Sequence, residues 1–330
     1  MKNFTFALLV LFPFLIFSQI INIPDDYATI QEGIDAAQEH DTVLVAAGIY
    51  EENLWFQYKN IVLASHYLIT LDTNSISQTI IDGGGSDCVL LIEEVQQMTH
   101  ICGLTLRNGY SDQFGGGLTL LGSTAQVTNM IIESNSANFG GGVFIGDGNP
   151  YFEHNRIINN VATQDGGGIM ARNCSFHFKE CSITGNQAGD GAALMFRTDF
   201  KDPVHFELFI NKCNVQNNAA GMQTGGLYFR KSFESIAILD VNVSDCHITE
   251  NTAFSSGGMQ IRGVEVHYNI RNCKISGNTV QTYNAGLNCS NGSFGSIINC
   301  VFAQNEAALN GEYWNGGGCT LWGSEADVYN

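Results

Sequence analysis

The feature that most constrains the fold is a short motif that recurs from residue 104 to the end of the chain. In each copy, a large apolar residue is followed three positions later by an asparagine. Successive asparagines lie 25, 26, 32, 33, 27 and 27 residues apart, and a period in this range is typical of one coil of a solenoid. These asparagines are Asn135, Asn160, Asn186, Asn218, Asn251, Asn278 and Asn305.

Each asparagine motif is followed, after a short loop, by a run of small residues and a strand-like segment. Glycine permits the positive φ and the close backbone approach of a sharp corner. Asparagine at a bend tolerates the left-handed conformation and can hydrogen-bond the backbone of the next coil. One coil cannot bury its apolar face alone, so coils must stack. The pattern predicts an all-β fold, a right-handed parallel β-helix. The small-residue runs are 115–117, 140–142, 166–168, 191–193, 225–226, 257–258, 285–286 and 316–318.

The charge of the chain excludes some partners. Only 14% of the residues are charged, and the formal net charge is −18. Phosphate binding needs a basic surface, so we expect no nucleic-acid partner, and adhesion to an anionic membrane is disfavoured for the same reason.

The first residues are typical of an export signal. Lys2 precedes an almost wholly apolar segment over 4–17, and Ser18 is a small residue at a plausible cleavage point. We therefore predict a signal peptide over residues 1–19 and a secreted or bacterial cell-surface protein. No second apolar run of about 18 residues follows, so we expect no transmembrane segment in the mature chain.

Residues 20–60 form a distinct N-terminal unit, and residues 61–330 form the coils. Thr29 and Glu32 have capping-box spacing, which predicts the start of a short helix. Residues 41–45 are typical of a buried strand. A short amphipathic helix followed by strands would cap the open end of a solenoid and cover its core.

The segment IPDDYATIQEGIDAAQEHDTVLVAAGIYEENL resembles the N-terminal part of the pectin-lyase-like superfamily, with His40 and Ala47 as departures from its usual Gly and Pro. This resemblance implies the β-helix fold. The repeated motifs also resemble those of chlamydial polymorphic outer-membrane proteins, which implies an adhesive role. Residues 323–330 line up with residues 122–129, where the earlier copy continues into a strand. We therefore expect a chain truncated at its C-terminus, or an end protected by a partner.

Half of the ten cysteines share one position of the repeat, two residues before its apolar residue. Alternation along a strand places them on the inner face, so we predict a column of small buried thiols. The alternative is disulfide bonds between coils, which an exported protein permits but which parallel stacked side chains fit poorly. The five are Cys181, Cys213, Cys246, Cys273 and Cys300.

Four arginines occupy equivalent positions in the strands after the glycine runs, and we call them the arginine column: Arg172, Arg197, Arg230 and Arg262. Like charges in neighbouring coils, about 4.8 Å apart, repel unless an anion lies between them. Arginine binds carboxylates through two parallel hydrogen bonds. The column therefore predicts a site for an acidic polysaccharide, with Phe144 and Tyr228 offering ring faces to its sugars.

Two other interpretations of the arginine column remain open. The arginines can shield the apolar residues beside them. Carboxylates of nearby loops can also neutralise them, and the candidates are Asp199, Asp202, Glu234, Asp240 and Glu265.

Catalytic signals in the sequence are weak. Asp165 and Asp190 precede the glycine runs of adjacent coils and could pair, as the two carboxylates of a glycosidase do. The sequence motifs of pectinesterases are missing. The eight histidines, among them His100, His154, His177 and His247, show no ligand spacing, so we expect no metal site and no cofactor. The resemblance to polysaccharide lyases of this fold, which typically use Ca²⁺, leaves Ca²⁺ as a cofactor only if the protein is a lyase.

Three functions follow from these patterns. The first is a secreted or surface protein, adhesin-like or binding an acidic polysaccharide along the solenoid face. The second is a polysaccharide lyase or hydrolase of the pectin-lyase-like kind. The third is a structural passenger of a larger surface protein.

Overall fold

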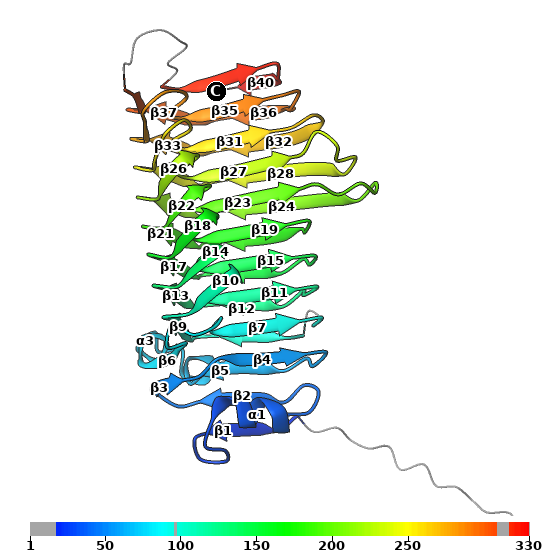
Figure 1. Cartoon of the computed structure of the whole chain (residues 1–330), viewed down its shortest axis with the longest axis vertical. Helices are drawn as coiled ribbons and strands as arrows, with labels where there is room; N and C mark the ends of the chain where they lie inside the picture. The colour runs from blue at the N-terminus through cyan, green and yellow to red at the C-terminus, as the bar shows by residue number, and fades with distance from the viewer. Residues whose placement is uncertain (1–17, 96–97, 309–316, 330) are drawn as a thin grey trace, which may run out of the picture.

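The computed structural model describes residues 18–95, 98–308 and 317–329. The chain forms a stack of coils whose strands build four parallel sheets; three of them run along the whole stack, and the fourth begins at β10 (Figure 1). The predicted fold, an all-β parallel β-helix, is confirmed. Residues 1–17 of the predicted signal peptide lie outside the described residues, so the export signal stays a prediction.

Two sheets contain the first two strands of each coil. Sheet A has 12 strands: β1 (Ile20–Ile23), β2 (Thr42–Val45), β5 (Val62–Ser65), β8 (His100–Cys102), β12 (Gln126–Thr128), β16 (Tyr151–Glu153), β20 (Phe176–Lys179), β24 (His205–Asn211), β28 (Ile238–Ser244), β32 (Val266–Arg271), β36 (Phe294–Ile298) and β40 (Glu325–Tyr329). Sheet B has 10 strands: β3 (Gly48–Glu51), β6 (Thr79–Asp82), β9 (Thr105–Arg107), β13 (Ile131–Glu133), β17 (Arg156–Ile158), β21 (Ser182–Thr184), β25 (Asn214–Gln216), β29 (His247–Thr249), β33 (Lys274–Ser276) and β37 (Val301–Ala303).

The other two sheets lie on either side of the glycine runs. Sheet D precedes the runs and has 8 strands: β10 (Tyr110–Phe114), β14 (Ser136–Phe139), β18 (Val161–Asp165), β22 (Gln187–Asp190), β26 (Ala219–Gln223), β30 (Thr252–Ala253), β34 (Thr279–Val280) and β38 (Glu306–Ala307). Sheet C follows them and has 10 strands: β4 (Leu54–Gln57), β7 (Leu90–Glu93), β11 (Leu118–Leu121), β15 (Val143–Gly146), β19 (Ile169–Arg172), β23 (Leu194–Thr198), β27 (Leu227–Lys231), β31 (Met259–Arg262), β35 (Leu287–Ser290) and β39 (Cys319–Trp322).

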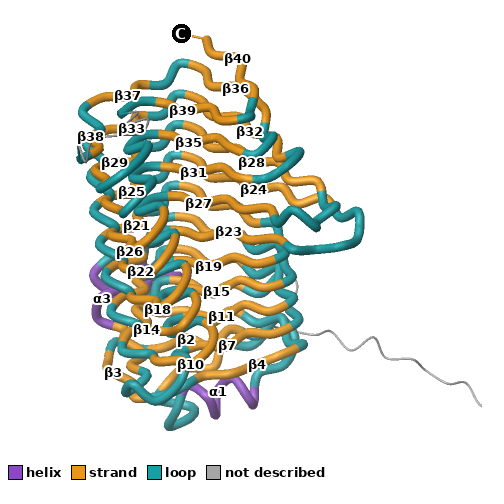
Figure 2. The backbone as a smooth tube through the Cα atoms, turned by 45° about the horizontal axis from the view of Figure 1, so that its top comes forward, coloured by secondary structure: helices purple, strands orange, loops and turns teal. Residues whose placement is uncertain are grey.

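A typical coil passes through sheets A, B, D and C in that order, and Figure 2 shows the resulting tube of short strands and tight turns. Inward side chains of sheets A, B and C form one continuous apolar core along the stack. In both views the loops that join β23 to β24 and β27 to β28 project from this stack. They account for the two longest coils of the repeat.

The N-terminal unit folds as predicted. Helix α1 (Ile30–Ala36) begins after Thr29, and the predicted capping box is present: Thr29 Oγ1 accepts from Glu32 N, and Glu32 Oε2 accepts from Thr29 N. Ile30 and Ile34 are buried in the core, and α1 covers the N-terminal end of the stack (Figure 1). Two short helices that the sequence did not predict, α2 (Tyr67–Thr70) and α3 (Asn74–Gln78), lie in the loop between β5 and β6.

The repeated asparagines form a buried hydrogen-bonded column between sheets B and D. Asn218 is representative: its Nδ2 donates to Asn251 Oδ1 at 2.9 Å and to the carbonyl of Ile183 at 2.9 Å. Its Oδ1 accepts from the backbone N–H of Asn186 at 2.9 Å. The predicted bonds to neighbouring backbones are confirmed. The left-handed conformation falls instead on the preceding residue, for example Asn217 with a φ of 57°.

The five repeated cysteines lie on the inner face, as predicted, and all ten cysteines of the chain are free thiols. Their Sγ atoms contact backbone carbonyls, such as that of Phe178 at 3.7 Å from Cys213. The interpretation as stacked thiols is therefore confirmed over the disulfide alternative.

No helix in the described part of the chain is both long and apolar enough to cross a membrane.

Candidate binding groove

A sharp bend at the glycine runs folds sheet D against the outer side of sheet C. Gly140 has a φ of 67°, and a Cβ on Gly141 would lie 2.3 Å from the carbonyl oxygen of Val161 in the next coil. A side chain at Gly141 would clash with this carbonyl. Sheet D and the outward residues of sheet C thus meet along the stack, and the arginine column lies beside them; we call this strip the groove, with sheet D as its wall, the outward residues of sheet C as its floor and the arginine column as its edge.

The floor of the groove is apolar and covered in the middle of the stack. Phe144 pairs in register with Met170, Met195 and Tyr228 of successive strands, as predicted. Phe144 and Tyr228, however, are only 4% and 0% exposed. The Phe114 ring of sheet D lies 4.4 Å from the Phe144 ring, which explains the burial of Phe144. The expectation that these two rings face sugars is therefore wrong.

The arginine column is present and lies beside this floor. The register aligns Arg172 with Arg197, Arg197 with Arg230, and Arg230 with Arg262. Arg172 is exposed, and the other three are half-buried. Arg197 Nε is buried and has no hydrogen-bond partner among the described residues.

Of the five carboxylates that were candidates to neutralise the column, one pairs with an arginine of the column and two pair elsewhere. Asp199 does pair with Arg172, at 3.1 Å. Burial opposes ionisation of Asp199, but hydrogen bonds from Asn173 and Arg172 hold its pKa below the usual value. Glu234 pairs instead with Lys201, and Asp240 pairs with two histidines. Over the described residues, the column's ion pairs are limited to this one at Arg172.

Asp165 and Asp190 lie on the sheet D wall and are paired in register on adjacent strands. Burial raises the pKa of Asp165, and the charge of Asp190 raises it further, while Arg197 and Arg230 act in the opposite direction. Burial also raises the pKa of Asp190, against a hydrogen bond from the backbone N–H of Gln223 at 2.8 Å. The structure thus brings together the carboxylate pair and the arginine column.

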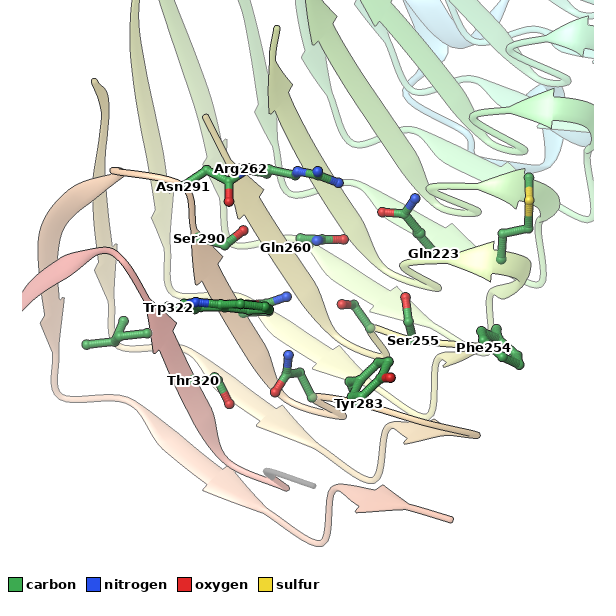
Figure 3. Close-up of a pocket in the computed structure, with 15 residues that line it drawn as sticks. Gln223, Phe254, Ser255, Gln260, Arg262, Tyr283, Ser290, Asn291, Thr320 and Trp322 are labelled. Atoms are coloured by element: carbon green, nitrogen blue, oxygen red, sulfur yellow. The ribbon is translucent and has the colours of Figure 1, made fainter. Parts of the chain in front are cut away.

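Towards the C-terminal end, the same groove opens into a pocket of about 1100 Å³ (Figure 3). Gln260 and Asn288 form the floor of the pocket and follow Tyr228 in register. Arg262, Ser290 and Trp322 form its edge and are in register on successive strands. Polar residues here replace the methionines and Tyr228. The pocket is therefore the part of the groove with room for a ligand.

Two amide oxygens in the pocket lack partners. Asn284 Oδ1 and Asn288 Oδ1 are buried and accept no hydrogen bond from the described part of the chain, and both residues are only 9% exposed. An unpaired buried acceptor is costly, so these atoms are suited to hydroxyl or amide donors of a ligand. Figure 3 places Trp322 on one side of the pocket and Tyr283 and Phe254 on the other, and all three rings are exposed.

Trp322 could have been found in the sequence. It follows the glycine run 316–318 at the same spacing as Arg262 follows 257–258. Asn284 and Tyr283 carry no such signal, because they lie in a loop outside the strand pattern.

Comparisons with known proteins give only a distant structural likeness. No family model matches the chain, and no curated protein matches it. Among solved structures, the A-module of the mannuronan C-5 epimerase AlgE6 of Azotobacter vinelandii is similar, with a TM-score of 0.44 and 15% sequence identity. The alignment covers 90% of this chain and 94% of that one. The likeness to chlamydial repeats stays a prediction.

Proposed function

We propose that this protein is secreted or displayed at the cell surface and binds an acidic polysaccharide along the groove, in an adhesin-like role. The observation that carries this proposal is the continuity of the arginine column with the pocket. Arg197, Arg230 and Arg262 supply positive charge on one edge, and Trp322 lies in register at the end of that edge.

The chemistry of the groove fits a uronic-acid chain. Guanidinium groups hold carboxylates through charge-assisted hydrogen bonds, which contribute about 1.5–3 kcal/mol each. Exposed rings such as Trp322 stack on the apolar faces of sugars, and Asn284 and Asn288 offer acceptors for hydroxyl groups. The strongly acidic surface elsewhere disfavours nonspecific binding of polyanions, so we expect an acidic ligand to bind at the arginine column and not at other surfaces.

A glycan array tests this proposal. We expect the wild-type protein to bind acidic glycans, and an Arg197→Ala, Arg230→Ala double variant to bind them about tenfold more weakly or worse. Arg156→Ala is the matched control, because Arg156 is exposed on β17 of sheet B, away from the groove. Absence of binding to any acidic glycan, or equal binding by the double variant, would refute the groove.

A second candidate function, hydrolysis or lyase cleavage of the same glycan, rests on the paired carboxylates Asp165 and Asp190. Burial raises the pKa of both carboxyls, and the charge of Asp190 raises that of Asp165 further, which is the direction that a general acid requires. Strands of neighbouring coils lie about 4.8 Å apart, close to the roughly 5–5.5 Å between the carboxyl groups of retaining glycosidases.

Product formation separates the two functions. If the protein cleaves its glycan, Asp165→Asn and Asp190→Asn each remove activity while binding persists. Binding with no new reducing ends and no unsaturated product assigns the groove to binding alone.

A further inference from the structure

A second polar cluster lies on the outer face of sheet A, on strands that do not form the groove. His205 and Glu207 are on β24, Asp240 is on β28, and His267 is on β32. The register pairs Glu207 with Asp240 and Asp240 with His267, so the three are stacked on successive coils. His205 precedes Glu207 by two residues and therefore faces the same side.

The side chains of this cluster converge on Asp240. His205 Nε2 lies 2.8 Å from Asp240 Oδ2, and His267 Nδ1 lies 3.0 Å from Asp240 Oδ1. One ligand atom each of His205, Glu207 and Asp240 lies within 4.8 Å of the other two. The His267 ring packs on Phe294, with centroids 4.2 Å apart, which limits its rotation.

The hydrogen bonds within this cluster do not satisfy all of its acceptor atoms. Asp240 Oδ1 is buried and accepts no hydrogen bond from a described residue, although His267 Nδ1 lies 3.0 Å away. Buried acceptors without a partner call for a further donor or a cation.

We propose that His205, Glu207 and Asp240 bind a divalent transition-metal ion of the zinc class, with His267 orienting Asp240 from behind. Imidazole and carboxylate together suit Zn²⁺ and its neighbours, whereas Ca²⁺ prefers an all-oxygen shell. Zinc bonds of about 2.0–2.2 Å separate ligand atoms by about 3.3–3.6 Å, so the 2.8 Å contact opens only slightly around the ion. The net charge of −18 favours a bound cation.

The sequence shows no ligand spacing here because the ligands come from different coils of unequal length. His205 and Asp240 are 35 residues apart, and Asp240 and His267 are 27 apart. β24 and β28 each have seven residues, compared with three in β16, and this extra length brings His205 and Glu207 into β24, with Glu207 opposite Asp240. The prediction of no metal site was based on spacing along the chain and therefore did not consider this cluster.

Titration of the untagged, reduced protein with Zn²⁺ by calorimetry tests the site. We expect one ion per chain, and loss of binding in both His205→Ala and Asp240→Asn. His267→Ala lowers the affinity about 10–100-fold, as loss of an orienting partner does. His247→Ala, an exposed histidine on β29 of sheet B, leaves binding unchanged.

Co²⁺ provides an independent readout that also distinguishes this site from the ten cysteines. A Co²⁺ complex of the cluster shows visible d–d absorption without a thiolate-to-cobalt charge-transfer band. Wild-type protein that binds neither ion, or His205→Ala and Asp240→Asn variants that bind as wild type does, would overturn the proposal. Urea unfolding confirms that both variants are folded.

Discussion

At the scale of single residues, the asparagine column replaces a strand ladder at the corner between sheets B and D. Asn218 is fully buried, and its side chain bonds to both neighbouring coils. Each bond is satisfied only if the coils above and below are in register. The column therefore fixes the register of the stack.

Asn218→Ala is expected to destabilise the protein by about 2–4 kcal/mol. The change leaves the backbone N–H of Asn186 buried without its acceptor, at a cost of about 1–3 kcal/mol, and removes the side-chain bonds to Asn251 and to the carbonyl of Ile183. Urea unfolding measures the effect. Asn242→Ala, on the outer face of β28, is the control and changes stability by less than about 0.5 kcal/mol. Equal effects of the two variants would contradict a structural role for the column.

Ionised Asp190 is expected to destabilise the protein, whereas Asn218 stabilises it. A raised pKa means that folded Asp190 binds its proton more tightly than unfolded Asp190 does. Stability is therefore lost as the pH rises from the ordinary value of 3.8 through the raised pKa. Asp190→Asn, which keeps an acceptor for Gln223 N, is expected to stabilise the protein at pH 7.

Thermal unfolding at several pH values checks this prediction. The gain from Asp190→Asn shrinks as the pH falls towards 3.8, where the wild-type carboxyl becomes protonated in both states. A variant that is less stable than wild type at pH 7 would show that ionised Asp190 is favoured by its surroundings, against the predicted direction.

At the scale of the elements, the corner between sheets D and C creates the groove. Gly226 lies in this corner, where an added Cβ would be 2.0 Å from the carbonyl oxygen of Gly258 in the next coil. Gly221, in β26 of the same coil, would place a Cβ no closer than 3.8 Å to its nearest neighbour.

This contrast predicts different tolerance of the two glycines to alanine. Gly226→Ala forces neighbouring backbones apart and is expected to cost about 1–3 kcal/mol or more. Gly221→Ala is expected to change stability by less than about 0.5 kcal/mol. Urea midpoints of the two variants provide the measurement, and a harmless Gly226→Ala would mean that the corner has room that the structure does not show.

Periodicity in the sequence was sufficient to predict the strands, the inward residues and the columns of asparagine, cysteine and arginine. Each coil stacks on the one before it, so equivalent positions of the repeat lie next to each other. It could not reveal that sheet D covers the outer side of sheet C. Phe144 and Tyr228 therefore alternate as outward residues but are buried. The pocket was also missed, because Asn284 and Tyr283 lie in a loop whose path depends on tertiary packing.

At the scale of the whole molecule, the groove is a linear surface that matches a linear ligand. Six register positions lie along its edge, so at about 4.8 Å per strand it spans about 24 Å. These positions are Arg172, Arg197, Arg230, Arg262, Ser290 and Trp322. A long polymer can engage several of them at once, whereas a monosaccharide contacts one or two.

The most direct test of the groove is calorimetric titration with oligouronates of increasing length, alongside the same oligomers with their carboxyl groups reduced to alcohols. We expect affinity to rise with length until the oligomer spans the groove and then to level off. We also expect the reduced series to bind about tenfold more weakly or worse. Equal affinity for the acidic and reduced series would show that the arginine column does not recognise the ligand, and the account of this groove would be wrong.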